Sequence, residues 1–97
     1  MKVGFSGPAR ADLRQISARI AADNPARAAS FVRELRERCE ELGRMHLMFT
    51  IVPRRADAMR RRVVGNYSIF YLTEVERIVI ARVLHNARDI GALLGED

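Results

Sequence analysis

RRRVVGNYSIFYLT, residues 60–73, predicts two β-strands joined by a tight turn. Its two halves are rich in valine, isoleucine, tyrosine and phenylalanine, which favour extended backbone. Between them, Gly65 and Asn66 both tolerate the positive φ angle that a two-residue hairpin turn requires. A further run of this kind, Arg77 to Leu84, follows the short connection Glu74-Val75-Glu76. The C-terminal half therefore predicts an antiparallel three-stranded meander.

The N-terminal half predicts two helices. Apolar residues recur at helical spacing over residues 9–20 and again over residues 28–42, while Arg10, Asp12 and Arg14 fall on other faces of the first helix. The apolar positions are Ala9, Leu13, Ile16 and Ile20 in the first helix, and Ala28, Phe31, Val32, Leu35, Cys39 and Leu42 in the second.

Capping residues mark the helix ends. Ser6 or Gly7 stands before the first helix. Asn24 is expected to cap the second helix, whose first turn contains Pro25. Gly43 is expected to end that helix in a left-handed conformation. The short connection between the helices predicts an antiparallel helical hairpin.

Both ends of the chain add a short element. Lys2 to Ser6 predicts a first strand, and Asp89 is expected to cap a last helical turn that Gly95 ends. The order strand, helix, helix, three strands and short helix indicates a single α+β domain over residues 1–97. We expect the hairpin to cover one face of the sheet and leave the other face free.

The stretch Met45-His46-Leu47-Met48-Phe49-Thr50-Ile51-Val52 has no clear period. It is compatible with a strand, a loop tucked under the sheet, or a surface that a partner covers.

Positive charge is concentrated in one run of the sequence. The chain has a net charge of +5, and five arginines lie within nine residues: Arg54, Arg55, Arg60, Arg61 and Arg62. Such a run predicts either a patch that attracts phosphates or an acidic protein segment, or a solvated loop and strand edge.

The composition argues against several classes of protein. A single cysteine, Cys39, forms no internal disulfide, and its helical spacing predicts a buried small hydrophobe. One cysteine and two distant histidines match no metal-ligand spacing, and we expect no metal or cofactor. Because no apolar run suits a signal peptide or a bilayer crossing, we expect a cytoplasmic protein without membrane association.

RVLHNARD, residues 82–89, is the densest group of polar side chains with catalytic potential. Cleavage of RNA through its 2′-OH needs a base, an acid and cations near the phosphate. The candidates are His85 as the titrating group and Arg61, Arg82 and Arg88 as cations. No further residue near the end of the chain completes an acid–base pair. Strand alternation also predicts that Arg82 and His85 point to opposite faces.

RVLHNARD also has a structural interpretation. Val83 and Leu84 would finish a buried strand, and a ring nitrogen of His85 would satisfy a loop backbone group. Asp89 would cap the last turn with Arg88 as its ion-pair partner. Direct contact with a partner protein is a third possibility.

Tyr67 and Tyr71 share one face of the predicted strand with Ile69. They would pack in the core or against a partner. The alternative is a stacking platform for bases, formed together with arginines.

Four groups of residues, in order, span almost the whole chain: Ala9 with Ala11-Asp12-Leu13 and Ile16; Asn24-Pro25 with Ala28-Ala29 and Phe31; Gly65-Asn66-Tyr67 with Ile69-Phe70-Tyr71; and Arg82-Val83-Leu84-His85 followed by Arg88-Asp89. In this order the chain resembles the ParE branch of the ParE/RelE toxin superfamily, the small toxins of bacterial type II toxin–antitoxin pairs.

The resemblance implies a toxin neutralised in a hetero-oligomer by a cognate ParD-like antitoxin, whose C-terminal segment wraps the sheet and the helical hairpin. ParE-like members are associated with poisoning of DNA gyrase by protein contact, without established catalytic residues. RelE-like members share the fold but cleave mRNA on the ribosome, which is the alternative activity. The same fold therefore supports two activities that act on different targets.

The resemblance and the charge pattern together suggest residues that contact the antitoxin or the target. Direct binding of nucleic acid stays open. The candidates are Phe31, Leu35, Phe49, Arg54, Arg55, Arg60, Arg61, Arg62, Tyr67, Tyr71 and Arg82.

Overall fold

The N-terminal strand extends the sheet beyond the predicted meander. In the computed structural model, which describes residues 1–94, β1 (Lys2–Phe5) runs parallel to β5 (Arg77–His85). The strand order is β1-β5-β4-β3-β2, so the sheet is mixed and has five strands. The sequence predicted an N-terminal strand but not its partner. It left open whether the stretch from Met45 to Val52 contains a strand, and the two-residue strand β2 (Thr50–Ile51) lies there, at the opposite edge of the sheet.

The predicted meander is confirmed. β3 (Arg60–Val64) and β4 (Tyr67–Thr73) pair antiparallel, and β4 pairs in the same way with β5. Val64 lies opposite Tyr67, and Gly65 has a φ of 59°, as the tight turn requires. Alternation along β4 then places Tyr67, Ile69 and Tyr71 on one face of the sheet.

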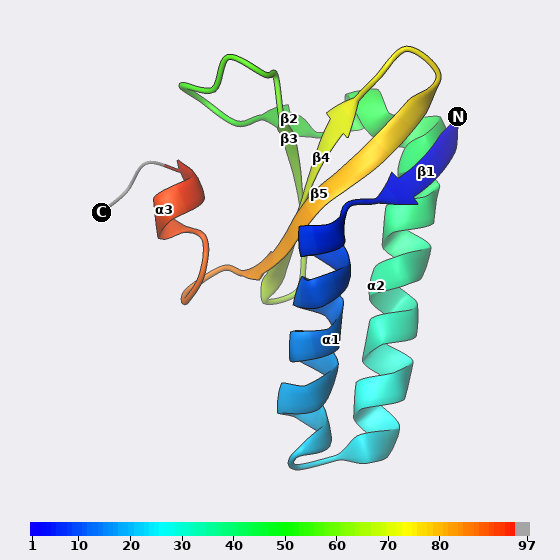
Figure 1. Cartoon of the computed structure of the whole chain (residues 1–97), viewed down its shortest axis with the longest axis vertical. Helices are drawn as coiled ribbons and strands as arrows, with labels where there is room; N and C mark the ends of the chain where they lie inside the picture. The colour runs from blue at the N-terminus through cyan, green and yellow to red at the C-terminus, as the bar shows by residue number, and fades with distance from the viewer. Residues whose placement is uncertain (95–97) are drawn as a thin grey trace.

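The two predicted helices form the expected hairpin, which lies on one side of the sheet (Figure 1). α1 (Gly7–Ala21) begins after Ser6, whose Oγ accepts a hydrogen bond from the Ala9 nitrogen at 3.1 Å. α2 (Pro25–Met45) begins after Asn24, whose Oδ1 accepts from the Arg27 nitrogen at 3.0 Å. Each side-chain oxygen satisfies a backbone N–H that has no partner within the helix, which explains where both helices begin.

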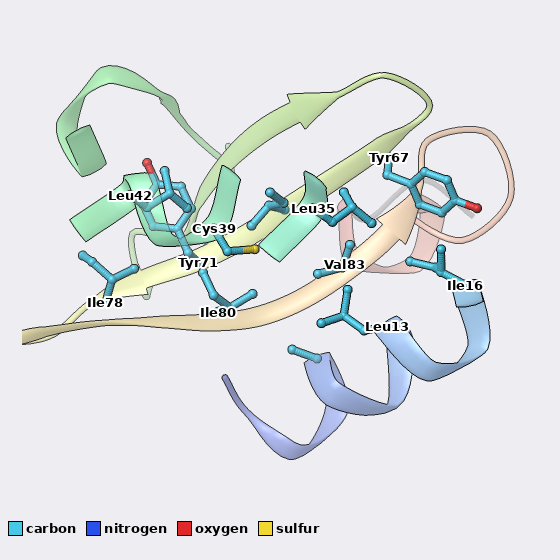
Figure 2. Close-up of a cluster of buried hydrophobic side chains, with 12 residues drawn as sticks. Leu13, Ile16, Leu35, Cys39, Leu42, Tyr67, Tyr71, Ile78, Ile80 and Val83 are labelled. Carbon is cyan, nitrogen blue, oxygen red and sulfur yellow. The ribbon is translucent and has the colours of Figure 1, made fainter. Parts of the chain in front are cut away.

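The main core lies between the helical hairpin and the sheet (Figure 2). Cys39 is fully buried there, as its spacing predicted, and burial raises the pKa of its thiol to about 12. The buried members of the cluster are Ala9, Leu13, Ile16, Leu35, Cys39, Leu42, Tyr67, Ile69, Tyr71, Ile78, Ile80 and Val83.

The opposite face of the sheet is covered, in contrast to the prediction. Phe70 and Leu84 alternate onto that face and are buried there by Val52, Met59 and Ile90. These residues come from the loop between β2 and β3 and from the segment before α3 (Gly91–Leu94), which lies away from the helical hairpin in Figure 1. Burial of these apolar side chains explains why short connecting segments form a second, thinner layer.

The stretch from Met45 to Val52 combines a helix end, a single turn and an edge strand. α2 ends at Met45, and the 3₁₀ turn η1 (His46–Met48) and β2 follow it. The Tyr71 hydroxyl donates to the His46 carbonyl oxygen at 2.5 Å, and Arg60 Nη1 donates to the Phe49 carbonyl oxygen at 2.6 Å. These two bonds fix the backbone, while Leu47 and Met48 are 70% and 71% exposed.

Gly43 does not end α2, so that prediction was wrong. The helix continues two residues further to Met45, and Gly43 is buried within it. A Cβ atom added at Gly43 would lie 2.3 Å from the Met1 carbonyl oxygen, and the Met1 nitrogen donates to the Gly43 carbonyl oxygen at 2.8 Å. Glycine is therefore required by the close approach of the N-terminal backbone.

We predict that Gly43→Ala lowers the free energy of unfolding by about 1–2 kcal/mol, since overpacking outweighs the better helix propensity of alanine. Urea denaturation measures the change. Gly7→Ala is the matched control, because a Cβ atom there meets no other atom within 4 Å. Equal stability of the two variants would contradict the packing role of Gly43.

Candidate functional site

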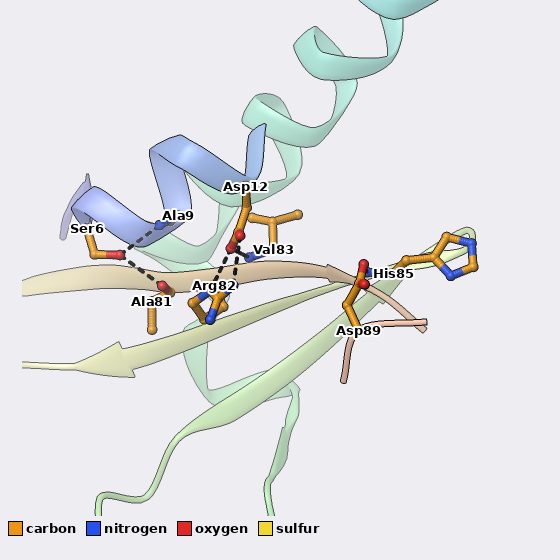
Figure 3. A network of polar contacts seen from close by, with 8 residues as sticks. All are labelled: Ser6, Ala9, Asp12, Ala81, Arg82, Val83, His85 and Asp89. Atoms are coloured by element: carbon orange, nitrogen blue, oxygen red, sulfur yellow. Dashed lines mark hydrogen bonds and ion pairs between the residues drawn. The ribbon is translucent and has the colours of Figure 1, made fainter. Parts of the chain in front are cut away.

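The end of β5 is completed by side chains from the segment that leaves the sheet. β1 pairs with β5 only as far as Phe5 opposite Ile80. Beyond that point Ser6 Oγ donates to the Ala81 carbonyl oxygen at 2.8 Å, and Asp12 Oδ2 accepts from the Val83 nitrogen at 2.9 Å (Figure 3). Both side chains thus replace the missing strand as backbone partners.

Arg82 is bound by the same carboxylate. Its Nε and Nη2 donate to the two oxygens of Asp12 at 2.8 and 2.9 Å. Asp12 is 6% exposed, and its hydrogen bonds raise the pKa of Arg82 above the ordinary value. Arg82 therefore holds α1 against β5, and its Nε–Nη2 edge is not available to a ligand.

The sequence pattern missed the role of Asp12, which had been assigned to another face of the first helix. Asp12 follows Ala9 by three residues and precedes Ile16 by four, so its side chain lies on the same face as both. That spacing beside two buried positions is the signal that predicts a buried carboxylate in need of a partner.

A β-bulge sets the direction of the side chains at the end of β5. Phe70 pairs with Arg82, but Tyr71 pairs with Ile80, which leaves Ala81 as an extra residue. Ile80 and Val83 consequently both reach the core beneath the helices. The predicted separation of Val83 from Leu84 is confirmed, because Leu84 packs in the cluster on the other face.

His85 points away from Arg82, as Figure 3 shows. Its Nδ1 accepts a hydrogen bond from the Ala87 nitrogen at 3.1 Å, which confirms the predicted loop contact. Its ring meets Tyr67 edge-on with the centroids 5.1 Å apart. The bond to Nδ1 stabilises the turn after β5.

Asp89, which was expected to cap the last turn, binds the backbone at the end of β5. Its Oδ2 accepts from the His85 nitrogen at 3.3 Å, and its own nitrogen donates to the His85 carbonyl oxygen at 3.1 Å. Asp89 therefore closes the turn after β5, and within residues 1–94 it forms no ion pair with Arg88. Gly95, expected to end the last turn, lies outside the described residues.

Arg61 lies on the sheet face away from the helices. Its Nε donates to Ser68 Oγ at 2.8 Å, its Nη2 reaches Asn86 Oδ1 at 3.5 Å, and its guanidinium lies 5.8 Å from the Phe70 ring centroid. Arg61, Arg82 and His85 thus bind three different sets of neighbours. His85, the candidate base, therefore does not converge with Arg61 and Arg82 on one reacting position.

The arginine run does not form one patch. Arg60 and Arg62 turn toward the helical side of the sheet, where Arg62 Nη1 pairs with Glu41 at 2.9 Å and lowers the pKa of that carboxyl. Arg55 pairs with Asp57 at 2.6 Å, which raises the pKa of Arg55 and lowers that of Asp57. Most of these guanidinium groups bind the protein itself.

Leu35 and Tyr71 are fully buried and cannot contact a partner in this conformation. Tyr67 is 7% exposed, and its ring centroid lies 5.4 Å from that of Phe31. Phe49 is half-buried, with the guanidinium of Arg62 4.9 Å from its ring centroid. The tyrosines therefore belong mainly to the core.

A groove of about 610 Å³ opens where β2 and β3 face α3. Arg54 and Arg61 line it, together with Ile51 and Val63, which are 45% and 56% exposed. Neither Ile51 nor Val63 was a predicted contact. The structure of the Met45 to Val52 stretch was left open, and nothing in the sequence distinguished Val63 from the other residues of its predicted strand. This groove combines exposed apolar side chains with positive charge.

The described residues define a small, basic α+β protein with a groove lined by apolar and basic residues. Within residues 1–94 no group of three histidine, cysteine, aspartate or glutamate side chains is placed to hold a metal ion. No helix in that part of the chain has the length and apolar character needed to cross a membrane.

Residues 3–90 match the family model described as the ParE toxin of the type II toxin–antitoxin system parDE. The chain therefore belongs to the ParE toxin family, as the order of its motifs predicted. A solved structure described as the chromosomal ParDE TA system from P. aeruginosa is similar, with a TM-score of 0.75 and 19% identity over 88% of this chain and 95% of that chain. At that identity the likeness concerns the fold. A comparison with curated proteins finds no match.

We predict that Asp12→Ala lowers the free energy of unfolding by about 2–3 kcal/mol, because it leaves Arg82 unpaired and the Val83 nitrogen without an acceptor. We expect a smaller loss of stability than for a fully buried ion pair, because the Arg82 side chain is 40% exposed. Urea denaturation measures it, and Asp23→Ala, at an exposed position, is expected to stay within about 0.5 kcal/mol of the original chain. A loss no larger than that of Asp23→Ala would remove Asp12 from this role.

Proposed function

We propose that the chain is a toxin that inhibits DNA gyrase by protein contact and is neutralised by a ParD-like antitoxin. Membership of the ParE family supports the toxin role. The separation of Arg61, Arg82 and His85, each bound to other neighbours, carries the preference for inhibition over RNA cleavage. A ribonuclease needs its acid, base and cations around one phosphate.

The groove beside β2 and β3 is the surface that we assign to the antitoxin. Ile51 and Val63 offer apolar area at an edge of the sheet, and Arg54 and Arg61 lie beside them. A segment with alternating apolar and acidic residues matches this combination. Such a segment would bury the apolar side chains and place its carboxylates on the arginines. The exposed Leu47 and Met48 of η1 extend the apolar surface along the chain.

We predict that Val63→Glu weakens binding of the antitoxin encoded beside this chain by at least about tenfold, since it places a charge on the apolar part of the groove. Isothermal titration calorimetry gives the affinity. Val75→Glu is the matched control, because Val75 is 96% exposed in the turn between β4 and β5 and does not line the groove. Equal losses in both variants, or equal affinity for unrelated acidic peptides, would count against this surface.

We predict that the purified chain inhibits gyrase supercoiling and accumulates cleaved-DNA complexes, and that His85→Ala retains this activity within about twofold, because His85 only stabilises a turn. A ribosome-dependent mRNA cleavage assay runs beside it. RNA cleavage that His85→Ala abolishes while folding and antitoxin binding persist would favour the endonuclease. Antitoxin binding without growth arrest on expression would indicate a binding partner that has lost toxicity.

A further inference from the structure

A second cleft lies between α1 and the end of β5, and it shares no lining residue with the groove. Its volume is about 370 Å³. Three arginines from three segments line it: Arg19 near the end of α1, Arg82 in β5 and Arg88 in the turn that follows. The sequence separates Arg19 from the other two by more than half the chain, so no run of basic residues indicates this cluster.

The three guanidinium groups differ in how many of their N–H donors are already bonded within the protein. Arg82 donates from Nε and Nη2 to Asp12, which leaves Nη1 without an acceptor among the described residues, and its side chain is 40% exposed. Arg19 and Arg88 are exposed, and within residues 1–94 neither makes a side-chain hydrogen bond or ion pair. Donors therefore remain at all three positions.

The two carboxylates in the cleft, Asp12 and Asp89, cancel part of this charge, so the three arginines leave a formal charge of +1. Both carboxylate oxygens of Asp12 already accept hydrogen bonds, from Arg82 and from the Val83 nitrogen. Asp89 is engaged by the His85 nitrogen and is the one remaining negative group of the lining. By contrast, several arginines elsewhere have acidic partners, as in Arg27–Glu34, Arg62–Glu41 and Arg77–Glu74. A net positive charge therefore remains in the lining, where Arg19 and Arg88 have no acidic partner among the described residues.

The lining also distinguishes between kinds of anion. Its apolar members Ile16, Val83 and Leu84 are 5%, 1% and 6% exposed, so an amphipathic peptide finds no apolar anchor there. Guanidinium groups bind phosphate through several parallel N–H···O bonds, and such contacts need no apolar surface. We propose that Arg19, Arg82 and Arg88 form a phosphate-binding cleft that takes a backbone phosphate of nucleic acid.

The test is binding of a short labelled DNA duplex to the free chain, followed by fluorescence anisotropy over a range of salt concentrations. Arg19→Ala and Arg88→Ala are each expected to weaken binding about threefold to tenfold and to reduce the slope of log affinity against log salt by about one. Arg14→Ala is the matched control, because Arg14 is exposed on α1 and does not line the cleft. We expect it to change affinity by less than about twofold.

Losses of equal size in Arg14→Ala and Arg19→Ala would overturn the proposal, since they would mean diffuse attraction to a basic protein. Displacement of the duplex by polyglutamate at the same charge concentration would also overturn it, in favour of a carboxylate site. Circular dichroism checks that the variants fold. Gyrase is absent from this measurement, so its outcome is separate from that of the gyrase assay.

Discussion

The structure depends on how β5 is completed after β1 turns away from it. β1 is only four residues long, whereas β5 has nine. A backbone N–H left without an acceptor in the interior is costly, and Asp12 prevents this at Val83 while it binds Arg82 on both oxygens. Because Asp12 belongs to α1, the interaction joins the helical hairpin to β5. The Asp12 carboxylate therefore accepts the hydrogen bond that Val83 would otherwise lack, positions the hairpin and binds Arg82.

Arginine is the cross-linking residue of this fold. Arg60 and Arg62 hold the segment after α2 through the Phe49 carbonyl and the Phe49 ring, and Arg61 binds Ser68 on the opposite face of the sheet. A planar guanidinium suits this work because it donates in several directions and stacks on aromatic rings. Part of the high arginine content therefore serves to hold the fold together, and the arginine count alone says little about ligands.

The two faces of the sheet serve different purposes. The face beneath the hairpin buries Tyr71 and Ile80 completely, as a stable core requires. The other face has a thin layer of loop and short helix over Phe70, which leaves a groove with exposed Val63 beside it. A family whose members belong to toxin–antitoxin systems would benefit from such incomplete coverage, because a partner can complete the layer.

The sequence by itself determined the local elements and the family. Local features depend on neighbours within a few residues, so they can be predicted from the sequence. They include the alternation in β4, the helical spacing from Ala28 to Leu42 and the caps at Ser6 and Asn24. The tertiary structure decided the parallel pairing of β1 with β5, the close approach that requires Gly43, and the partner of each arginine. Those features join residues far apart in the chain. No local pattern records them, because strand register and helix packing choose the partners only once the chain has folded.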